Sequence, residues 1–319
     1  MSKIFKITYE PDEFYGTPLD SDTLFGHICW AIRYNFGEDK LVEILDLFNN
    51  GNPPFLVSSS FPEGYLPKPT LPPLEIDYNK ERSKKETKIN RQKFKKQKKI
   101  SFIKIDEFIE NQSMLSSSTI FNAPDADIDH KEFILTRNAI NRETMRVIEG
   151  ALFTETYYYL DNRNIKEKRK LWSFIRIEDE KYKIDFFNEI FKYLSDVGIG
   201  KDKSTGKGRF IIKVIEVIGA EKNIFDFIGT HFFTLSHTAG ANLDPIAYTT
   251  FTRYGKLGEE FSTKGVFYKK PIMFYKHGSI FVNTNKNIYG ETVKNISTIE
   301  NVIQYGYAFP LYFNFKENI

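Results

Sequence analysis

A glycine-rich connection at residues 198–208 separates a helical pattern from a strand pattern, and this order limits the folds that the chain can adopt. Upstream, apolar residues recur at helical spacing between Ile184 and Leu194. Downstream, the β-branched run from Phe210 to Ile218 is typical of a strand. Nucleotide-binding loops run in the opposite order, from a strand into a helix whose N-terminus holds the phosphate. The sequence therefore predicts an α-to-β connection and disfavours an ATP cradle.

The composition of the same loop favours phosphate binding of another kind. Residues 198–209 contain four glycines and four basic residues. Glycine supplies positive φ values and lets backbone amides approach a phosphate, while lysine and arginine add positive charge. The spacing is not that of a P-loop, because five residues separate Gly200 from Gly206 and Gly208 stands where the hydroxyl residue should be. The pattern favours an extended phosphate chain as ligand, and an ordinary lysine-rich turn is the alternative.

Composition narrows the class of protein. The 319 residues suffice for one large domain or two ordinary ones, and a formal net charge of only +3 means that any surface for a polyanion is local. The single cysteine, Cys29, excludes an internal disulfide and a cysteine-based zinc site. The first residues lack the apolar stretch of a signal peptide, and no apolar window has the length of a membrane span. We expect a cytoplasmic protein.

Periodicity along the chain predicts an α+β fold of two ferredoxin-like, RRM-like modules. The expected elements of the first module are a strand at 3–9, a helix at 21–36, strands near 131–138, 151–160 and 171–177, a helix at 183–196 and a strand at 209–218. With a helical and basic insertion at about 38–128 removed, the order reads as βαββαβ, the split ferredoxin-like pattern that RNA-recognition modules also use. We place this module at 1–220, and a second, mostly β module with several short strands at 221–319.

Two charged segments of the insertion have no assigned role. The run from Lys80 to Lys99 is strongly basic and is opposed only by Glu81 and Glu86. Such a run suits an RNA-facing arm, but a solvated helix or disorder is the commoner explanation. The acidic cluster at 125–129 lacks the continuation of an EF-hand loop, so a solvated loop explains it.

Catalytic and metal-binding motifs are not apparent in the sequence. None of the five histidines forms an HExxH pair or another spacing typical of a closed metal site, so we predict neither a metal nor a cofactor. Cys29 lies in an apolar helix, which is a poor setting for a nucleophile. RNA cleavage without a metal needs only a base, an acid and a cation. His27 is the candidate base, with Lys201 or Lys207 as the cation, although a structural role for this histidine is the simpler expectation.

Three blocks of sequence, in this order, carry a resemblance to a known family: Ser21–His27 with Trp30 and Ala31, the loop Gly198–Phe210, and Tyr305–Pro310. Together they resemble the RAMP superfamily of CRISPR systems. Within it, the segment Phe55–Ser60, the segment Tyr65–Pro69 and the polar cluster Arg137–Thr144 resemble the fourth subunit of type III-A Csm effector complexes. The resemblance spans nearly the whole chain.

This resemblance implies a non-catalytic, RNA-binding scaffold subunit in CRISPR antiviral defence. Such a subunit would grip the 5′ handle of the crRNA and would join the large polymerase-bearing Csm subunit to the filament of backbone RAMP subunits. By position, the RNA contacts in the loop would be Gly198, Gly200, Lys201, Lys203, Ser204, Gly206, Lys207, Gly208 and Arg209. Further contacts would be Arg137, Asn138, Asn141 and Arg142, on a hairpin that reaches toward the RNA.

Two other functions remain open at this point. Some RAMP relatives cleave crRNA repeats without a metal, and His27 would be the base in such an endoribonuclease. Alternatively, the aromatic C-terminal module binds protein, and the basic segments merely aid solubility.

Overall fold

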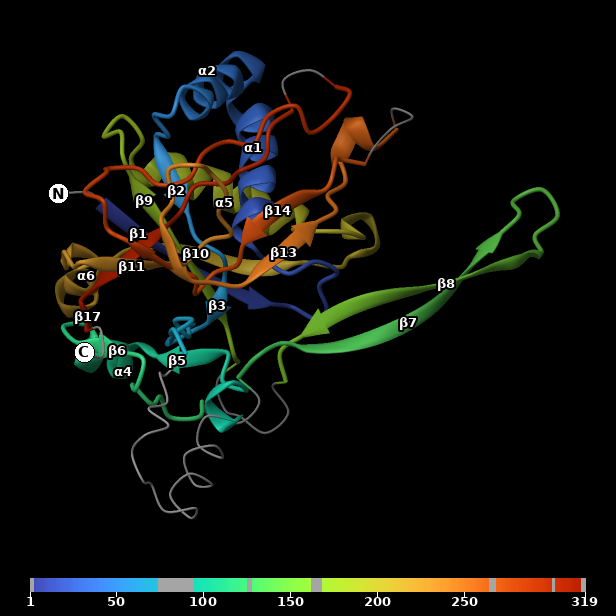
Figure 1. Cartoon of the computed structure of the whole chain (residues 1–319). Helices are drawn as coiled ribbons and strands as arrows, with labels where there is room; N and C mark the ends of the chain where they lie inside the picture. Colours follow the sequence, from blue (N-terminus) through green and yellow to red (C-terminus); the bar gives the residue numbers. More distant parts are fainter. Residues whose placement is uncertain are drawn as a thin grey trace.

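An antiparallel sheet forms the centre of the first half of the chain. The computed structural model describes residues 3–73, 95–124, 128–161, 168–263, 268–299 and 302–316 (Figure 1). The strands of this sheet are β1 (Lys3–Pro11), β2 (Phe55–Val57), β9 (Leu171–Ile177) and β10 (Phe210–Glu216), in the order β10-β1-β9-β2, with β3 (Phe61–Pro62) also paired to β9. Pro11 at the end of β1 pairs with Phe210, whereas Lys3 at its start pairs with Ile177. The glycine loop before β10 therefore lies at the Pro11 end of the sheet.

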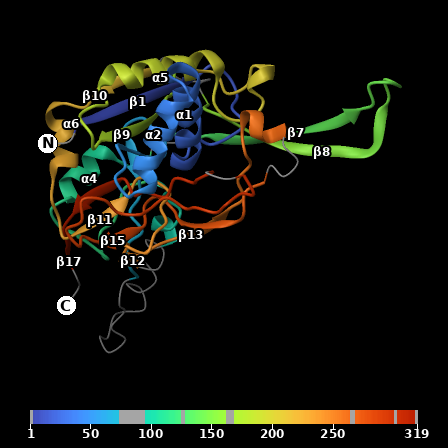
Figure 2. The ribbon, with the colours of Figure 1, turned by 90° about the horizontal axis from the view of Figure 1, so that it is seen from above.

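Two helices, α1 (Ser21–Phe36) and α5 (Ile184–Val197), pack on one face of this sheet (Figure 2). Helix α5 presents buried Phe187 and Phe191 at helical spacing, and these rings lie 5.8 Å from Phe5 and 6.3 Å from Tyr9 between centroids. Burial of each such side chain contributes about 2 to 3 kcal/mol to folding. A further helix, α2 (Glu38–Asn49), packs against α1.

The middle strands of the first module differ from the sequence prediction. Segments 131–138 and 151–160 do form strands, in β7 (Lys131–Ile140) and β8 (Val147–Tyr159), but these two form a separate two-stranded sheet. Tyr158 of β8 makes one further isolated bridge, with Tyr15. Along the chain, the strand of this sheet that follows α1 is instead β2, which pairs with β9 and lies inside the predicted insertion at 38–128. The proline- and serine-rich stretch around Phe55–Ser60 suggests a short edge strand, and β2 is indeed at the edge of this sheet. Its three residues are too few to show a period-two pattern, so the sequence did not assign it to the central strands of the module.

A second antiparallel sheet and a hairpin make up most of the remaining chain. The sheet has the order β12 (Pro245–Ala247), β15 (Ile280–Val282), β11 (His231–Thr234) and β16 (Pro310–Phe313), and the hairpin joins β13 (Thr250–Arg253) to β14 (Ile272–Tyr275). Helix α6 (Gly219–Asp226) lies between the two sheets in sequence. Phe174 of β9 packs against Phe225 of α6 and Phe309 beside β16, so one core joins both halves of the chain.

Short elements fill the insertion and tie it to the second sheet. They are β4 (Tyr65–Pro67), β5 (Phe102–Lys104), α4 (Ile105–Asn111) and β6 (Leu115–Ser116), with β17 (Phe315–Lys316) parallel to β6. Two 3₁₀ turns are η1 (Lys203–Thr205) and η2 (Glu259–Thr263). Most of the basic run 80–99 lies outside the described residues. The same is true of Asp125 and Asp127 in the acidic cluster 125–129. Among the helices that the structure describes, none is long and apolar enough to cross a membrane.

Candidate nucleic-acid interface

The glycine loop is folded tightly between α5 and β10. Helix α5 ends at Gly198, which has a φ of 89° and donates its amide hydrogen to the carbonyl of Leu194 at 2.8 Å. Ile199 N then donates to Gly208 O at 2.8 Å, which closes the loop on itself. A Cβ on Gly208 would lie 2.1 Å from the carbonyl oxygen of Ile199, and its φ of 68° is also one that other residues seldom adopt. Gly208 is therefore required by the close approach of two backbone segments.

Most backbone amides of the loop donate to acceptors of the protein itself, contrary to the prediction of an amide cradle for phosphate. Gly200 N donates to His27 Nε2 at 2.9 Å, Lys201 N to Thr17 Oγ1 at 3.2 Å and Gly208 N to Phe14 O at 2.8 Å. The amides of residues 205–207 donate to carbonyls within the loop. A donor that is already paired inside the protein gains little from a phosphate. The amide-nest interpretation is wrong for these groups. The amides of residues 202–204 are not among them, so a phosphate contact is left to those three amides and to the side chains.

The four cations of the loop differ in their surroundings. Lys201 forms an ion pair with Glu155 of β8, and Lys203 forms one with Glu259 at 2.5 Å. The ammonium of Lys207 lies 5.0 Å from the centroid of the Phe14 ring, and Arg209 is exposed. No carboxylate of the described chain pairs with Lys207 or with Arg209. These two side chains are consequently the loop cations best placed to meet an external anion.

The hairpin β7–β8 projects from the body as a long arm, and the glycine loop packs beside it (Figure 1). Arg137 of β7 pairs with Asp202 of the loop at 3.1 Å, and the Tyr157 hydroxyl of β8 donates to the same carboxylate. Asp202 itself has a left-handed φ of 63°. Close to the body, the rings of Phe14 and Phe133 lie 4.8 Å apart. Loop and arm thus form one unit, although Arg137 and Asp202 are distant in sequence.

The other predicted hairpin contacts lie farther along the arm. Asn138 is exposed on β7, and Arg142 is exposed in the turn between the two strands. Asn141 shapes that turn, because its Oδ1 accepts hydrogen bonds from Glu143 N at 2.9 Å and Thr144 N at 3.1 Å. Of the four predicted hairpin residues, the structure therefore brings only Arg137 into contact with the glycine loop.

Comparison with known proteins agrees with this architecture. The model of the RAMP superfamily matches residues 9–211, which include α1, α5, strands β2 and β9 of the first sheet, the hairpin and the glycine loop. The chain belongs to the RAMP superfamily. The resemblance seen in the sequence is thereby confirmed, together with the mixed α+β class of the fold. No curated protein matches the sequence of this RAMP chain.

Solved structures resemble the RAMP chain over nearly its full length. A chain of a Csm1-Csm4 cassette in complex with AMPPNP matches with a TM-score of 0.62 and 18% identity, covering 99% of this chain and all of that one. A Csm1-Csm4 cassette with cA4 gives 0.61 and 19% with the same coverage. A Csm3-Csm4 subcomplex of the type III-A interference complex gives 0.60 and 14%, covering 98% of this chain and all of the other. At these identities the likeness shows a shared fold.

His27, the candidate catalytic base, is a structural partner of the loop in this RAMP chain. Its Nε2 accepts the hydrogen bond from Gly200 N, so the lone pair that would take a proton is already engaged. Burial, with a smaller contribution from the charge of Lys203, lowers the pKa of His27 from 6.5 to about 3. A base with so low a pKa is weak near neutral pH.

The two other blocks of the resemblance are also built into the core. Asp22 near the start of α1 pairs with Arg253 through contacts of 2.6 and 2.7 Å. The Tyr305 hydroxyl accepts a hydrogen bond from Val57 N at 2.8 Å, and the Tyr307 hydroxyl donates to Phe48 O at 2.5 Å. Burial raises the pKa of Tyr305, which keeps its hydroxyl neutral. These blocks hold the two halves of the RAMP chain together.

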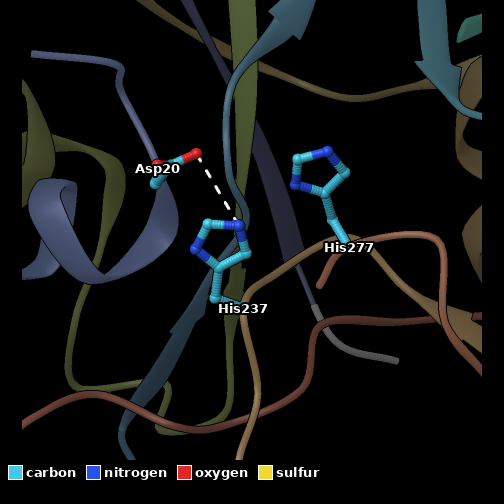
Figure 3. Close-up of side chains that lie close together, drawn as sticks. All are labelled: Asp20, His237 and His277. Carbon is cyan, nitrogen blue, oxygen red and sulfur yellow. Dashed lines mark ion pairs between the residues drawn. The ribbon is translucent and has the colours of Figure 1, made fainter. Parts of the chain in front are cut away.

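One cluster was missed by the sequence analysis altogether. Asp20, His237 and His277 lie side by side although the first two are 217 residues apart in the chain (Figure 3). No local spacing could reveal such a group, because each residue comes from a different segment.

Proposed function

We propose that this chain is a non-catalytic, RNA-binding scaffold subunit of a type III-A CRISPR interference complex. In this role it grips the 5′ handle of the crRNA in the cytoplasm. It also links a large polymerase-bearing Csm1-type subunit to a Csm3-type backbone filament. Support for the partners comes from the full-length likeness to chains of Csm1-Csm4 and Csm3-Csm4 assemblies.

The proposal includes the finer description of the fold as two ferredoxin-like, RRM-like modules. Three features support this for the first module: the strand order β10-β1-β9-β2, the antiparallel pairing, and the two helices on one face. For the second module the support is weaker, since its sheet follows the order β12-β15-β11-β16 and its strands are short.

The main support for the RNA-binding role is the contact between the glycine loop and the projecting hairpin. Arg137 and Asp202 fix the loop against the arm, and this places Lys207 and Arg209 beside the base of the arm. A rigid arm with cations at its foot suits a single-stranded polyanion, because such ligands are held chiefly through phosphate contacts. The loop amides that donate to acceptors of the protein hold the backbone that carries Lys207 and Arg209.

The non-catalytic part of the proposal is supported by the surroundings of His27. Its proton-accepting nitrogen bonds to Gly200, and its depressed pKa disfavours proton uptake near pH 7. The enzyme alternative is tested by incubating the purified protein with repeat RNA in EDTA. We expect no site-specific cleavage. Cleavage that is lost in His27→Ala and kept in the matched variant His231→Ala would overturn the scaffold role.

The RNA-binding and linking roles are tested by native co-purification. We expect short RNAs with one shared 5′ end to travel with the protein, together with a large subunit and a repeated backbone subunit. Recovery of the protein subunits without RNA would favour the protein-binding alternative. Recovery of RNA without a common 5′ sequence would contradict handle recognition.

A further inference from the structure

We propose that Asp20, His237 and His277 form a binding site for a divalent transition-metal ion that joins the two halves of the chain. One carboxylate oxygen of Asp20 and one ring nitrogen of each histidine lie within 4.8 Å of one another. Imidazole nitrogen together with carboxylate oxygen is a donor set that suits zinc, iron(II), cobalt and nickel. The site is independent of the role in RNA binding.

The two histidines are short of hydrogen-bond partners. Both ring nitrogens of His237, a residue that is only 3% exposed, have no hydrogen-bond partner, and neither has the buried Nδ1 of His277. A buried polar atom without a partner costs about 1 to 3 kcal/mol, so such atoms call for a missing ligand such as an ion. Figure 3 shows a nitrogen of His277 directed toward the His237 ring, on the side that faces Asp20.

The geometry is close to that of a bound site. His237 Nε2 lies 3.8 Å from Asp20 Oδ1, and the two imidazole planes are inclined by only 9° with centroids 5.3 Å apart. Ligand atoms at about 2.0 to 2.1 Å from a metal are roughly 3 to 3.4 Å from each other. Side-chain shifts of about 1 Å or less would therefore bring the three donors onto one ion.

A second carboxylate, that of Asp22, lies near the other ring nitrogen of His237. Asp22 Oδ1 lies 3.5 Å from His237 Nδ1, on the opposite side of the ring from Asp20. Metal-bound histidines commonly direct their other nitrogen to a carboxylate, which fixes the tautomer and raises the basicity of the ligating nitrogen. Asp22 is itself held in place by Arg253 and by Gln304 Nε2 at 3.1 Å. Arg253 also lies 3.3 Å from Asp20, and the ammonium of Lys269 acts on Asp22, so two cations balance the two carboxylates. The attraction for a metal ion therefore comes from the donor atoms and not from net charge.

The backbone around the ligands is firmly positioned. Asp20 is the residue before α1, His237 follows β11, and His277 lies in the turn between β14 and β15. His237 N donates to the hydroxyl of Ser21 at 2.9 Å, so the first two ligands are tied together before any ion binds. Asp20 also lines a small pocket with Pro18, Ser60 and His130. A bound ion would connect α1 to two loops of the second sheet.

Zinc and cobalt titrations of the full chain test the proposal. The protein is prepared without a polyhistidine tag, treated with EDTA and exchanged into metal-free buffer. We expect one equivalent of Zn²⁺ to bind per chain and to raise the melting temperature. His277→Ala and Asp20→Asn are expected to weaken binding at least tenfold, while His231→Ala, which removes a histidine outside the cluster, leaves it unchanged.

A spectroscopic measurement keeps the proposal testable even if a variant does not fold. Co²⁺ added to the wild-type chain is expected to give visible ligand-field bands of a histidine and carboxylate site, with saturation at one equivalent. Added Zn²⁺ should displace the bound Co²⁺, and the bands should then disappear. Failure of the wild type to bind either ion, or equal binding by the folded variants His277→Ala and Asp20→Asn, would overturn the proposal.

Discussion

The salt dependence of RNA binding should distinguish the two unpaired loop cations from the two paired ones. Each phosphate contact on single-stranded RNA contributes about 0.7 to the slope of log K against log salt concentration. Lys207 and Arg209 have no carboxylate partner in the described chain, so the double variant Lys207→Ala/Arg209→Ala should lower the slope by about 1.4. If the affinities converge near 1 M salt, this corresponds to roughly 25-fold weaker binding at 0.1 M.

Lys201 and Lys203 should contribute less for a structural reason. Each must leave its glutamate, Glu155 or Glu259, before it can bind a phosphate. The gain from the phosphate is offset by the lost ion pair, so we expect Lys201→Ala/Lys203→Ala to lower the slope by less than half as much.

The assay is fluorescence anisotropy of a 5′-handle RNA titrated with each protein from about 50 to 300 mM salt. The matched control is Lys3→Ala/Lys286→Ala, which changes the net charge equally. Lys3 begins β1 at the end of the sheet remote from the loop, and Lys286 precedes Asn287, whose carbonyl contacts Arg176 near that same end. A slope change in the Lys201/Lys203 variant that equals or exceeds that of Lys207/Arg209, or an equal change in the control, would refute the reasoning.

Three further predictions concern stability. Because the folded pKa of His27, about 3, lies below its unfolded value of 6.5, its contribution is complete above pH 6.5 and is lost as the pH falls toward 3. In urea unfolding, the free energy of unfolding of the wild type should therefore fall by about 2 kcal/mol relative to that of His27→Gln between pH 7 and pH 5. A difference between the two proteins that does not change with pH would contradict the assigned pKa. Gly208→Ala should lower the melting temperature much more than Gly206→Ala, since both have positive φ but only Gly208 would place a Cβ against a carbonyl. Arg253→Ala leaves Asp22 buried without its ion pair and should cost about 3 to 5 kcal/mol by chemical denaturation, and a loss below about 1 kcal/mol would speak against this role.

Local patterns in the sequence were sufficient to predict most helices and strands, but not to predict which strands pair or which groups form hydrogen bonds with each other. The order of α5, glycine loop and β10 followed from apolar spacing, because both elements are long enough to show their period. The hydrogen-bond partners of the loop amides could not be predicted, since the acceptors on Phe14, Thr17 and His27 are more than 170 residues away in the chain. The segment Phe55–Ser60 suggested a short edge strand, but the three residues of β2 are all buried and show no alternation, so its pairing with β9 could not be predicted.

The glycines of the loop therefore have a different purpose from the one that their chemistry first suggests. Gly198 and Gly208 allow the two ends of the loop to touch, with a Cβ on Gly198 only 3.0 Å from Gly208 O and one on Gly208 still closer to Ile199. In a loop that is closed in this way, the amides of residues 198–201 and 205–208 cannot turn to a phosphate without breaking their own hydrogen bonds. It can, however, present Lys207 and Arg209 from a fixed backbone, which reduces the entropy lost when a polyanion binds. Contacts between these cations and phosphates depend on charge and spacing and not on the identity of the bases. Any preference for the base sequence of a handle must therefore come from residues outside the loop.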